Sequence, residues 1–367
     1  MNVAAFIYDK RGWQRSGGDW HERNVALLAD DAIAAARLLR QALKIPVGYW
    51  GISQGGWVLA RIAATDRDAS FLIGVAAAGI SPVQQELWHK QRMMETAQYP
   101  LWARRVADHF WSGALGLMVR LDRHPDFMPK LLEGERAASS FGLDYDPLHD
   151  WRMSKAPLLL LHGAKDLIAP SWDGGRRIRA VRPTGSITVV KVVPAASHAI
   201  TTKTTGLAFD WGEAYDPVYA TTMAAFIADP SKLASVSQQS PAATNTPWPA
   251  RRPLAAYTTL GSLILLPIVL LAALLKTPGR LSKMQALTGL AGYSALVSLL
   301  AYAIYPHGSF YSASNLFPIW GWLVPLFAAA TVSLCVVILV QAARRREASL
   351  ALLSSGTTLA FAFLWFW

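Results

Sequence analysis

The sequence predicts a mixed α/β domain built on a mostly parallel sheet, followed by an all-α region of four transmembrane helices. Strand-like and helix-like patterns alternate through residues 1–228, and such alternation is typical of parallel sheets covered by helices. Residues 254–367 hold only seven charged side chains, six of them basic, which is far too few for the surface of an ordinary soluble domain. A chain of 367 residues has room for both parts.

The elements of the first part follow from hydrophobic spacing. Apolar residues three and four apart predict helices, and short apolar runs predict strands. We expect strands at residues 3–8, 46–50, 71–77, 158–162 and 187–193, and helices at residues 22–43, 54–64, 171–181 and 217–227. The strand at 158–162 begins with four consecutive Leu residues, which indicates that both of its faces are buried.

The second part consists of four apolar runs, each long enough to cross about 30 Å of hydrocarbon. They cover residues 254–275, 285–305, 317–343 and 349–367. Lys and Arg gather in the first and third connections, so the positive-inside rule places those connections in the cytoplasm and the first part outside it. No charged residue interrupts the runs, which favours anchoring over transport. Residues 229–253 are rich in Ser, Pro, Ala, Gln and Thr and are expected to form a flexible linker.

Composition excludes several function classes. A single cysteine, Cys335, excludes a disulfide framework and a Cys-ligated zinc site. The sequence contains neither a zinc-binding HExxH pattern nor a glycine-rich phosphate loop, so no metal and no cofactor is expected. The net charge of +11 is divided between the membrane connections and scattered positions of the first part, without a basic stripe, and nucleic acid is not expected as a partner.

The sharpest chemical signal is the pattern Gly-Ile-Ser-Gln-Gly at residues 51–55. It lies between an expected strand and an expected helix, where a nucleophile elbow requires it. Glycines at 51 and 55 are expected to let the strand and the helix approach closely. Ser53 would be the nucleophile, held in a strained turn with its hydroxyl exposed. The backbone N–H of Gln54, at the start of the helix, would stabilise an oxyanion.

A serine hydroxyl needs a base to take its proton, and an acid to orient that base. Asp166 follows the strand at 158–162, and His198 follows the strand at 187–193. The carboxyl ends of parallel strands meet at one edge of a sheet, so we expect Ser53, Asp166 and His198 to converge there. Asp173 is the alternative acid, although it falls inside an expected helix. His162 is expected to support the Asp166 loop through hydrogen bonds.

Other histidines and acidic residues of the first part are not expected to take part in catalysis. Surface or lid positions are expected for His21, His89, His109, His124 and His149, and capping or turn roles for Asp144, Asp146 and Asp150.

Three segments together resemble the α/β-hydrolase superfamily, most closely bacterial serine esterases and serine-aminopeptidase-like hydrolases. They are the Asp-Lys-Arg-Gly loop with its Ser-Gly-Gly sequel in residues 8–20, the elbow in residues 50–57, and the acid strand with its loop in residues 146–166. The resemblance implies a Ser-Asp-His triad of Ser53, Asp166 and His198 and an acyl-enzyme intermediate.

The resemblance also implies that residues 83–150 form a helical lid over an acyl pocket. Several large apolar side chains of this stretch would suit an apolar acyl chain, or would equally be plain helical core: Trp102, Phe110, Trp111, Leu115 and Met118.

One departure from the family pattern concerns the beginning of the chain. The family's sheet has three strands before the one that matches residues 3–8, and the loop after the third strand supplies a second oxyanion N–H. Residues 3–8 are therefore expected to lack a neighbouring strand, and the oxyanion hole to be half built. We expect the chain to be an N-terminal truncation whose missing part also held a signal peptide.

The expected function is that of a serine hydrolase cleaving carboxylic esters, with amides less favoured. The substrate would be a small ester or acyl compound, and the lipid bilayer a partner of the C-terminal helices. The expected location is a bacterial inner membrane, with the hydrolase domain outside the cytoplasm. The alternative is a catalytically impaired, membrane-anchored binding protein with a hydrolase-like domain.

Overall fold

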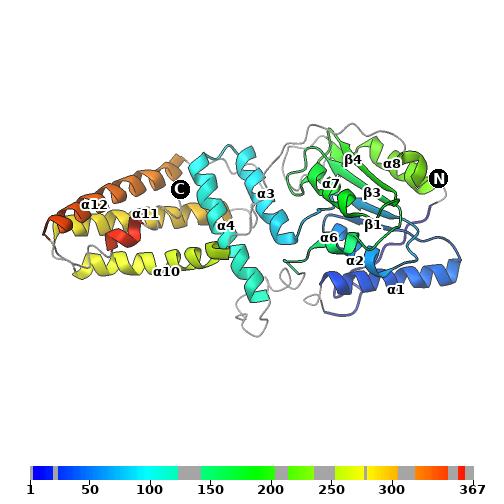
Figure 1. Cartoon of the computed structure of the whole chain (residues 1–367), viewed down its shortest axis with the longest axis horizontal. Helices are drawn as coiled ribbons and strands as arrows, with labels where there is room; N and C mark the ends of the chain where they lie inside the picture. The colour runs from blue at the N-terminus through cyan, green and yellow to red at the C-terminus, as the bar shows by residue number, and fades with distance from the viewer. Residues whose placement is uncertain are drawn as a thin grey trace. The chain divides into compact units, whose positions relative to one another are not determined.

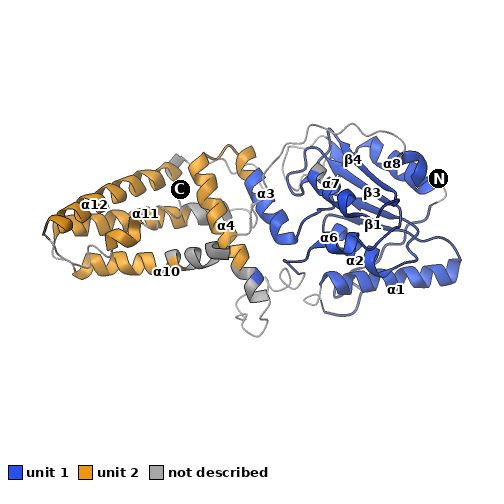
Figure 2. Ribbon diagram, in the orientation of Figure 1, with its two compact units in different colours: residues 1–92, 118–249 blue, residues 93–117, 250–367 orange. Residues whose placement is uncertain are grey.

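The computed structural model describes residues 3–19, 24–122, 142–202, 214–234, 253–276, 279–304, 319–345 and 354–359. The chain forms two compact units, and neither is continuous in sequence (Figure 2). The first unit combines Met1–Arg92 with Met118–Pro249, and the second combines Met93–Leu117 with Ala250–Trp367.

The first unit is built on a parallel four-stranded sheet (Figure 1). Its strands are β1 (Tyr49–Ile52), β2 (Leu72–Val75), β3 (Leu158–Gly163) and β4 (Thr188–Val193), and they lie side by side in that order. The register places Leu72 beside Tyr49 on one side and Leu158 on the other. Every residue of β3 is buried, as the Leu run predicted. The mixed α/β class and the parallel sheet are thus confirmed.

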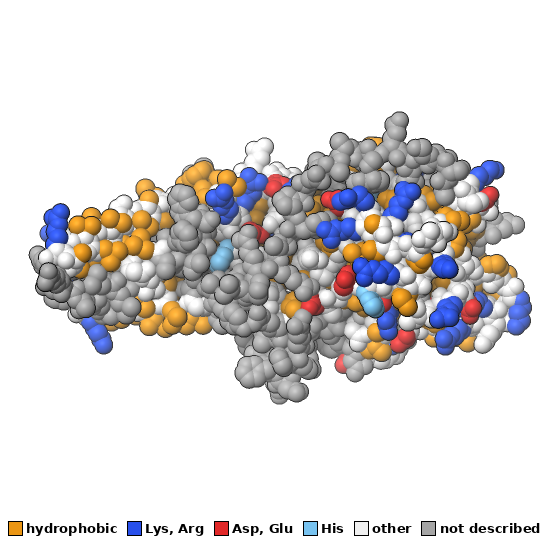
Figure 3. All heavy atoms as spheres, viewed as in Figure 1, with side chains coloured by type: hydrophobic (Ala, Val, Ile, Leu, Met, Phe, Trp, Pro, Cys, Tyr) orange, Lys and Arg blue, Asp and Glu red, His pale blue; other side chains and the backbone are white. Residues whose placement is uncertain are grey.

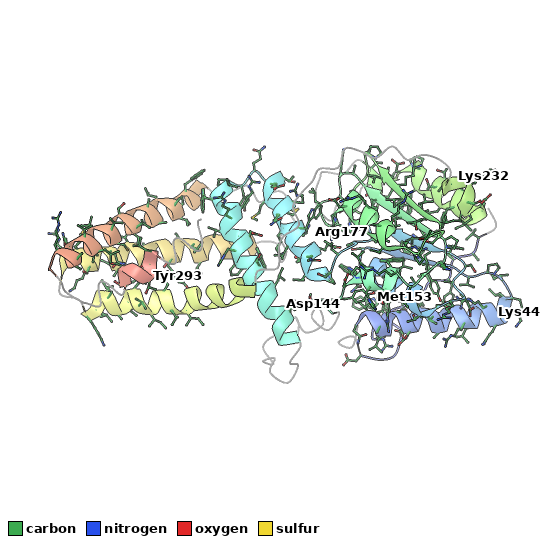
Figure 4. The ribbon with its side chains drawn as sticks, in the orientation of Figure 1. Lys44, Asp144, Met153, Arg177, Lys232 and Tyr293 are labelled. Atoms are coloured by element: carbon green, nitrogen blue, oxygen red, sulfur yellow. The ribbon has the colours of Figure 1, made fainter. Side chains whose placement is uncertain are left out.

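Helices cover both faces of this sheet. Successive strand residues point to opposite faces, and the apolar side chains on each face pack against helices. Leu158 and Leu160 pack on one face with Ile33 of α1 (Val25–Leu43), Leu59 of α2 (Gln54–Thr65), Trp151 of α6 (Pro147–Trp151) and Ile178 of α7 (Ser171–Val181). Leu159 and Leu161 pack on the other face with Phe226 of α8 (Pro217–Ala228). In Figure 4, Lys44 marks the end of α1 and Arg177 marks α7. A short α9 (Pro230–Ala234) and a two-stranded pair, β5 (Thr201–Thr202) with β6 (Ala214–Tyr215), complete the unit.

The expectation of a strand at residues 3–8 is wrong. The described residues 3–8 join no sheet, and most of their apolar side chains are exposed, Ile7 by 89%. A strand is held by hydrogen bonds to a neighbour, and β1 pairs only with β2 among the described strands. The four later strands correspond to β1–β4.

The second unit is a helical bundle. Its long helices are α4 (Leu101–Asp122), α10 (Pro253–Lys276), α11 (Arg280–Ile304) and α12 (Leu323–Arg345), with a 3₁₀ turn at Ile319–Trp322 and the end of α3 (Pro82–Thr96). Val106 of α4 packs against Leu296 of α11 and Val324 of α12, and Trp102 and Phe110 lie against them.

Part of the stretch expected to form a lid therefore lies in this bundle. Met93–Leu117 groups with the C-terminal helices, and the apolar face of α4 is core of the helical unit. Leu115 is buried, and Trp111 packs beside Met94 and Tyr99. The side chain of Met118 and residues 123–141 lie outside the described part of the chain.

The number of membrane-spanning helices differs from the expectation. Among the described residues one helix, Leu323–Arg344, is long and apolar enough to cross a membrane, rather than four. The apolar stretch of α10, Ile264–Lys276, is shorter than a membrane span. The first two turns of α11 contain the polar residues Arg280, Lys283 and Gln285. Most of the expected span at residues 349–367 lies outside the described residues, as do residues 235–252 of the expected linker. Figure 3 shows hydrophobic side chains gathered over the helical unit on this face, and interspersed charges on the first unit.

Candidate active site

Ser53 lies at the junction where β1 ends and α2 begins. Its backbone has φ 54° and ψ −112°, a conformation that a residue other than glycine adopts only under strain. Two hydrogen bonds hold the turn. The Ser53 N–H donates to Val75 of β2 at 2.9 Å, and the Gly56 N–H donates to the Ser53 carbonyl at 2.8 Å. The sequence expectation of a tight turn at this serine agrees with this geometry.

The glycines around Ser53 have different tasks. A Cβ at Gly51 would lie 2.8 Å from the Gly55 carbonyl oxygen, and a Cβ at Gly56 would lie 2.6 Å from the Ala77 side chain. A Cβ at Gly55 would meet nothing within 4 Å. Close packing therefore requires Gly51 and Gly56, whereas the motif had indicated Gly51 and Gly55.

Gln54 is the first residue of α2, where a backbone N–H has no acceptor within the helix. This N–H and the positive end of the helix dipole can stabilise negative charge that develops beside Ser53. The Gln54 side chain has a separate partner. Its Oε1 accepts a hydrogen bond of 2.9 Å from Lys10 Nζ.

Asp166 and His198 form a hydrogen-bonded pair at the carboxyl ends of β3 and β4. His198 Nδ1 lies 2.9 Å from Asp166 Oδ2, and both side chains are buried. The other carboxylate oxygen, Oδ1, accepts the backbone N–H groups of Ile168 at 2.7 Å and Ala169 at 2.9 Å. A carboxylate that only accepts places the proton on Nδ1, which leaves Nε2 of His198 free to take a proton.

The two loops that carry this pair are fastened to each other. The Lys165 N–H donates to Ala196, and the Ala164 N–H donates to Val193, both at 2.9 Å. Gly163 permits this approach, because a Cβ there would lie 2.1 Å from the Ser197 carbonyl oxygen. The acid and base are thus positioned by backbone contacts rather than by flexible side chains.

Ser53 lies at the same edge of the sheet as this pair, separated from it by β2. All four strands are parallel, so the loops after β1, β3 and β4 emerge at one edge. In the described part of the chain no hydrogen bond joins the Ser53 hydroxyl to His198. Hydrogen bonds between a catalytic serine and its base commonly form only when a substrate is bound. His198 therefore stays the candidate base.

The alternative acid, Asp173, lies in α7 and forms an ion pair with Arg176 at 3.3 Å. Asp146 caps α6 by accepting the Leu148 N–H, and Asp150 accepts from the Tyr145 hydroxyl at 2.7 Å.

His162 does not support the Asp166 loop through hydrogen bonds, contrary to expectation. Its side chain is fully buried, and neither ring nitrogen has a partner among the described residues. Burial lowers the pKa of His162 to about 4, opposed by the negative charge of Asp166. The ring is therefore neutral at physiological pH.

His89 is a residue that sequence reasoning missed. It was expected at the surface or in a lid, but it is fully buried, and its Nδ1 lies 2.6 Å from the carbonyl oxygen of Leu167, next to Asp166. Burial lowers the pKa of His89. A lone histidine on a helix carries no sequence signal for such a contact. His21, His124 and His307 lie outside the described residues.

Comparison with known protein families gives no match to this chain, and comparison with curated proteins gives none either. Within the described residues no group of three His, Cys, Asp or Glu side chains is arranged to hold a metal ion. The arrangement of Ser53, Asp166 and His198 is chemically suited to nucleophilic acyl transfer, in which a serine, a base and its orienting acid act in sequence.

Proposed function

We propose that this protein is a serine hydrolase of the α/β-hydrolase type that cleaves carboxylic esters. The observation that carries the proposal is the buried Asp166–His198 pair at the sheet edge where the strained Ser53 lies. Strained backbone conformations cluster at active sites, and a nucleophile together with an oriented base is the combination that acyl transfer requires. The order of Ser53, Asp166 and His198 along the chain also matches the triad order of that superfamily.

In the proposed reaction the Ser53 oxygen attacks the ester carbonyl while His198 Nε2 takes its proton. Asp166 stabilises the resulting imidazolium, and the Gln54 N–H donates a hydrogen bond to the developing oxyanion. His198 then returns the proton to the leaving alcohol, and the acyl group stays on Ser53. Water, deprotonated by His198, attacks the acyl carbon. The bond to Ser53 then breaks, His198 returns the proton to the Ser53 oxygen, and the carboxylic acid leaves.

A fluorophosphonate probe and p-nitrophenyl esters of short and long acyl chains test this function in the full chain, purified in detergent. We expect the probe to label wild type, and Ser53→Ala to abolish labelling and to lower kcat by at least about 10³-fold, in line with loss of a catalytic nucleophile. Ser70→Ala is the matched control, because Ser70 is exposed at the opposite ends of the strands. Labelling that persists in Ser53→Ala would contradict the proposal.

A second candidate is a membrane-anchored binding protein that has lost catalysis. It is favoured by one observation: Gln54 is the single backbone oxyanion donor that the described geometry identifies. Loss of one such donor costs about 10²–10³ in rate. The same experiment separates the candidates, since a binding protein would neither react with the probe nor turn over any ester.

We also propose that the helical unit anchors the protein in a membrane, with α12 as the span and the first unit outside the cytoplasm. The length and apolar composition of α12 support the anchor. In the sequence, Arg344, Arg345 and Arg346 stand at the C-terminal end of this span, which places that end in the cytoplasm and the chain before α12 outside it.

Cysteine labelling tests this orientation. In a Cys335→Ser background, a membrane-impermeant maleimide should label Lys155→Cys on intact spheroplasts, and should label Arg344→Cys, at the far end of α12, only after lysis. The reverse pattern would place the first unit in the cytoplasm.

A further inference from the structure

Lys10 lies beside the residue that donates to the oxyanion. Its Nζ is 2.9 Å from Gln54 Oε1, and both side chains approach from segments far apart in sequence. We propose that the Lys10 ammonium supplies positive charge on the oxyanion side of Ser53, in addition to the Gln54 N–H. This inference rests on the proposed serine hydrolase function and assigns a residue that acts in its transition state.

The loop that carries Lys10 has a defined geometry. The Ser16 hydroxyl donates to the Asp9 carbonyl at 2.6 Å, and the Trp13 N–H donates to the Lys10 carbonyl at 3.0 Å. Arg11 makes two hydrogen bonds to Asp31 of α1, at 2.8 and 2.7 Å. Such a fork fixes the orientation of a guanidinium as well as its position. The backbone on both sides of Lys10 is therefore fastened, which aims its side chain at the elbow.

The electrostatics at this position favour a ligand of negative charge. The start of α2 is the positive end of a helix dipole, and a cation placed there is unfavourable in the resting protein. The side-chain oxygen Oε1 of Gln54 partly offsets this cost by accepting a hydrogen bond from Lys10. When a tetrahedral oxyanion forms beside Gln54, the dipole and the ammonium both stabilise it. Stabilisation that appears only in the transition state raises kcat.

Lys10 can reach an oxyanion by rotation of its own side chain. A lysine side chain carries its ammonium group on a flexible four-carbon chain, and the side chain of Lys10 is exposed. A shift of Nζ from Gln54 Oε1 toward the oxyanion exchanges one acceptor for another. No bond is made or broken by Lys10 in this step, and no proton is transferred.

The test compares Lys10→Met and Lys10→Arg with wild type, in the full chain. We expect Lys10→Met to lower kcat by about 10–100-fold with KM changed less than about 3-fold, since charge loss in a partly solvated site costs less than loss of a buried oxyanion donor. Lys10→Arg keeps the charge and should retain most of the activity. Lys155→Met is the matched control, because Lys155 is exposed before β3, at the opposite edge of the sheet, and its kcat should not change.

Phenylboronic acid gives a readout that a structural role would not move. It forms an anionic tetrahedral adduct with a reactive serine, so its inhibition constant should rise in Lys10→Met by about the same factor as kcat/KM falls. Unchanged boronate affinity in Lys10→Met, together with slower turnover, would overturn the inference in favour of a loop-folding role. Unchanged turnover in Lys10→Met would overturn it and leave the hydrolase standing. Absence of Ser53 labelling in wild type would overturn both.

Discussion

Asp166 uses both of its carboxylate oxygens, one for His198 and one for the backbone of its own loop. Asp166→Asn keeps the size of the side chain but presents an amide to His198 in place of a carboxylate. We expect kcat to fall by about 10³–10⁴-fold, because the imidazolium loses its stabilising charge and the ring favours the wrong tautomer. The measurement is ester turnover at saturating substrate.

Asp173→Asn is the control for this substitution, because Asp173 pairs with Arg176 in α7. Its kcat should stay within about twofold of wild type. Equal losses in the two variants would show that Asp166 has been given the wrong role.

His162 provides a prediction about acid stability. Its pKa is about 4 in the folded protein and about 6.5 when unfolded, so between these values the unfolded chain binds the extra proton. The free energy of unfolding therefore decreases as the pH falls from about 6.5 to 4. At pH 5 this decrease is about 2 kcal/mol.

His162→Leu should remove this dependence without loss of stability at pH 7, since it replaces a buried ring whose nitrogens have no described partner. Thermal unfolding of the first unit at pH 5 and pH 7, in detergent, measures the difference. A variant whose melting temperature falls on acidification as steeply as that of wild type would contradict the argument.

Some of these residue roles can be predicted from the sequence, and others cannot. Ser53, Asp166 and His198 each follow a recognisable strand, and the parallel sheet converts their positions along the chain into proximity. The contacts of Lys10 with Gln54 and of His89 with Leu167 depend on how a loop and a helix fold back onto the sheet. Hydrophobic spacing contains no information about such contacts.

At the scale of elements, Gly56 is one of the two glycines that the close packing of α2 requires. Gly56→Ala places a methyl group against Ala77 and should destabilise the first unit by about 1–3 kcal/mol. Gly55→Ala, one position earlier in the same helix, meets open space and should be neutral or stabilising. Thermal unfolding compares the two, and a larger loss in Gly55→Ala would contradict the observed packing.

The elements that the sequence predicts best are those with a regular pattern of buried apolar residues. The strand of consecutive Leu residues and the amphipathic α1 and α7 carry strong periodic signals, and the structure contains them. Residues 3–8 have the composition of a strand, but a strand also needs a neighbour, and composition cannot supply one. The apolar face of α4 was equally ambiguous, because an acyl pocket and a helix interface require the same side chains.

For the molecule as a whole, the proposed membrane attachment depends on α12, the helix that is long and apolar enough to cross a membrane. Val336 and Val337 are partly exposed near its middle, and charge there costs about 2.5–3.5 kcal/mol per residue in a membrane. We expect Val336→Lys combined with Val337→Lys to shift the protein from the alkaline-carbonate pellet to the supernatant. Leu38→Lys, on the exposed face of α1, should leave the protein in the pellet. Retention of the double variant would show that α12 is not the anchor.

The discontinuity of the two units determines how the protein can be divided. The chain leaves the first unit after Arg92, returns at Met118 and leaves again after Pro249. A protease that cuts between residues 235 and 250 would separate the sequence at one point, yet Met93–Leu117 would still belong to the bundle. Removal of the C-terminal helices would strip Val106 of its contacts with Leu296 and Val324 and expose an apolar surface to water. A shortened form of this protein would therefore need α4 redesigned as well as the C-terminal helices removed.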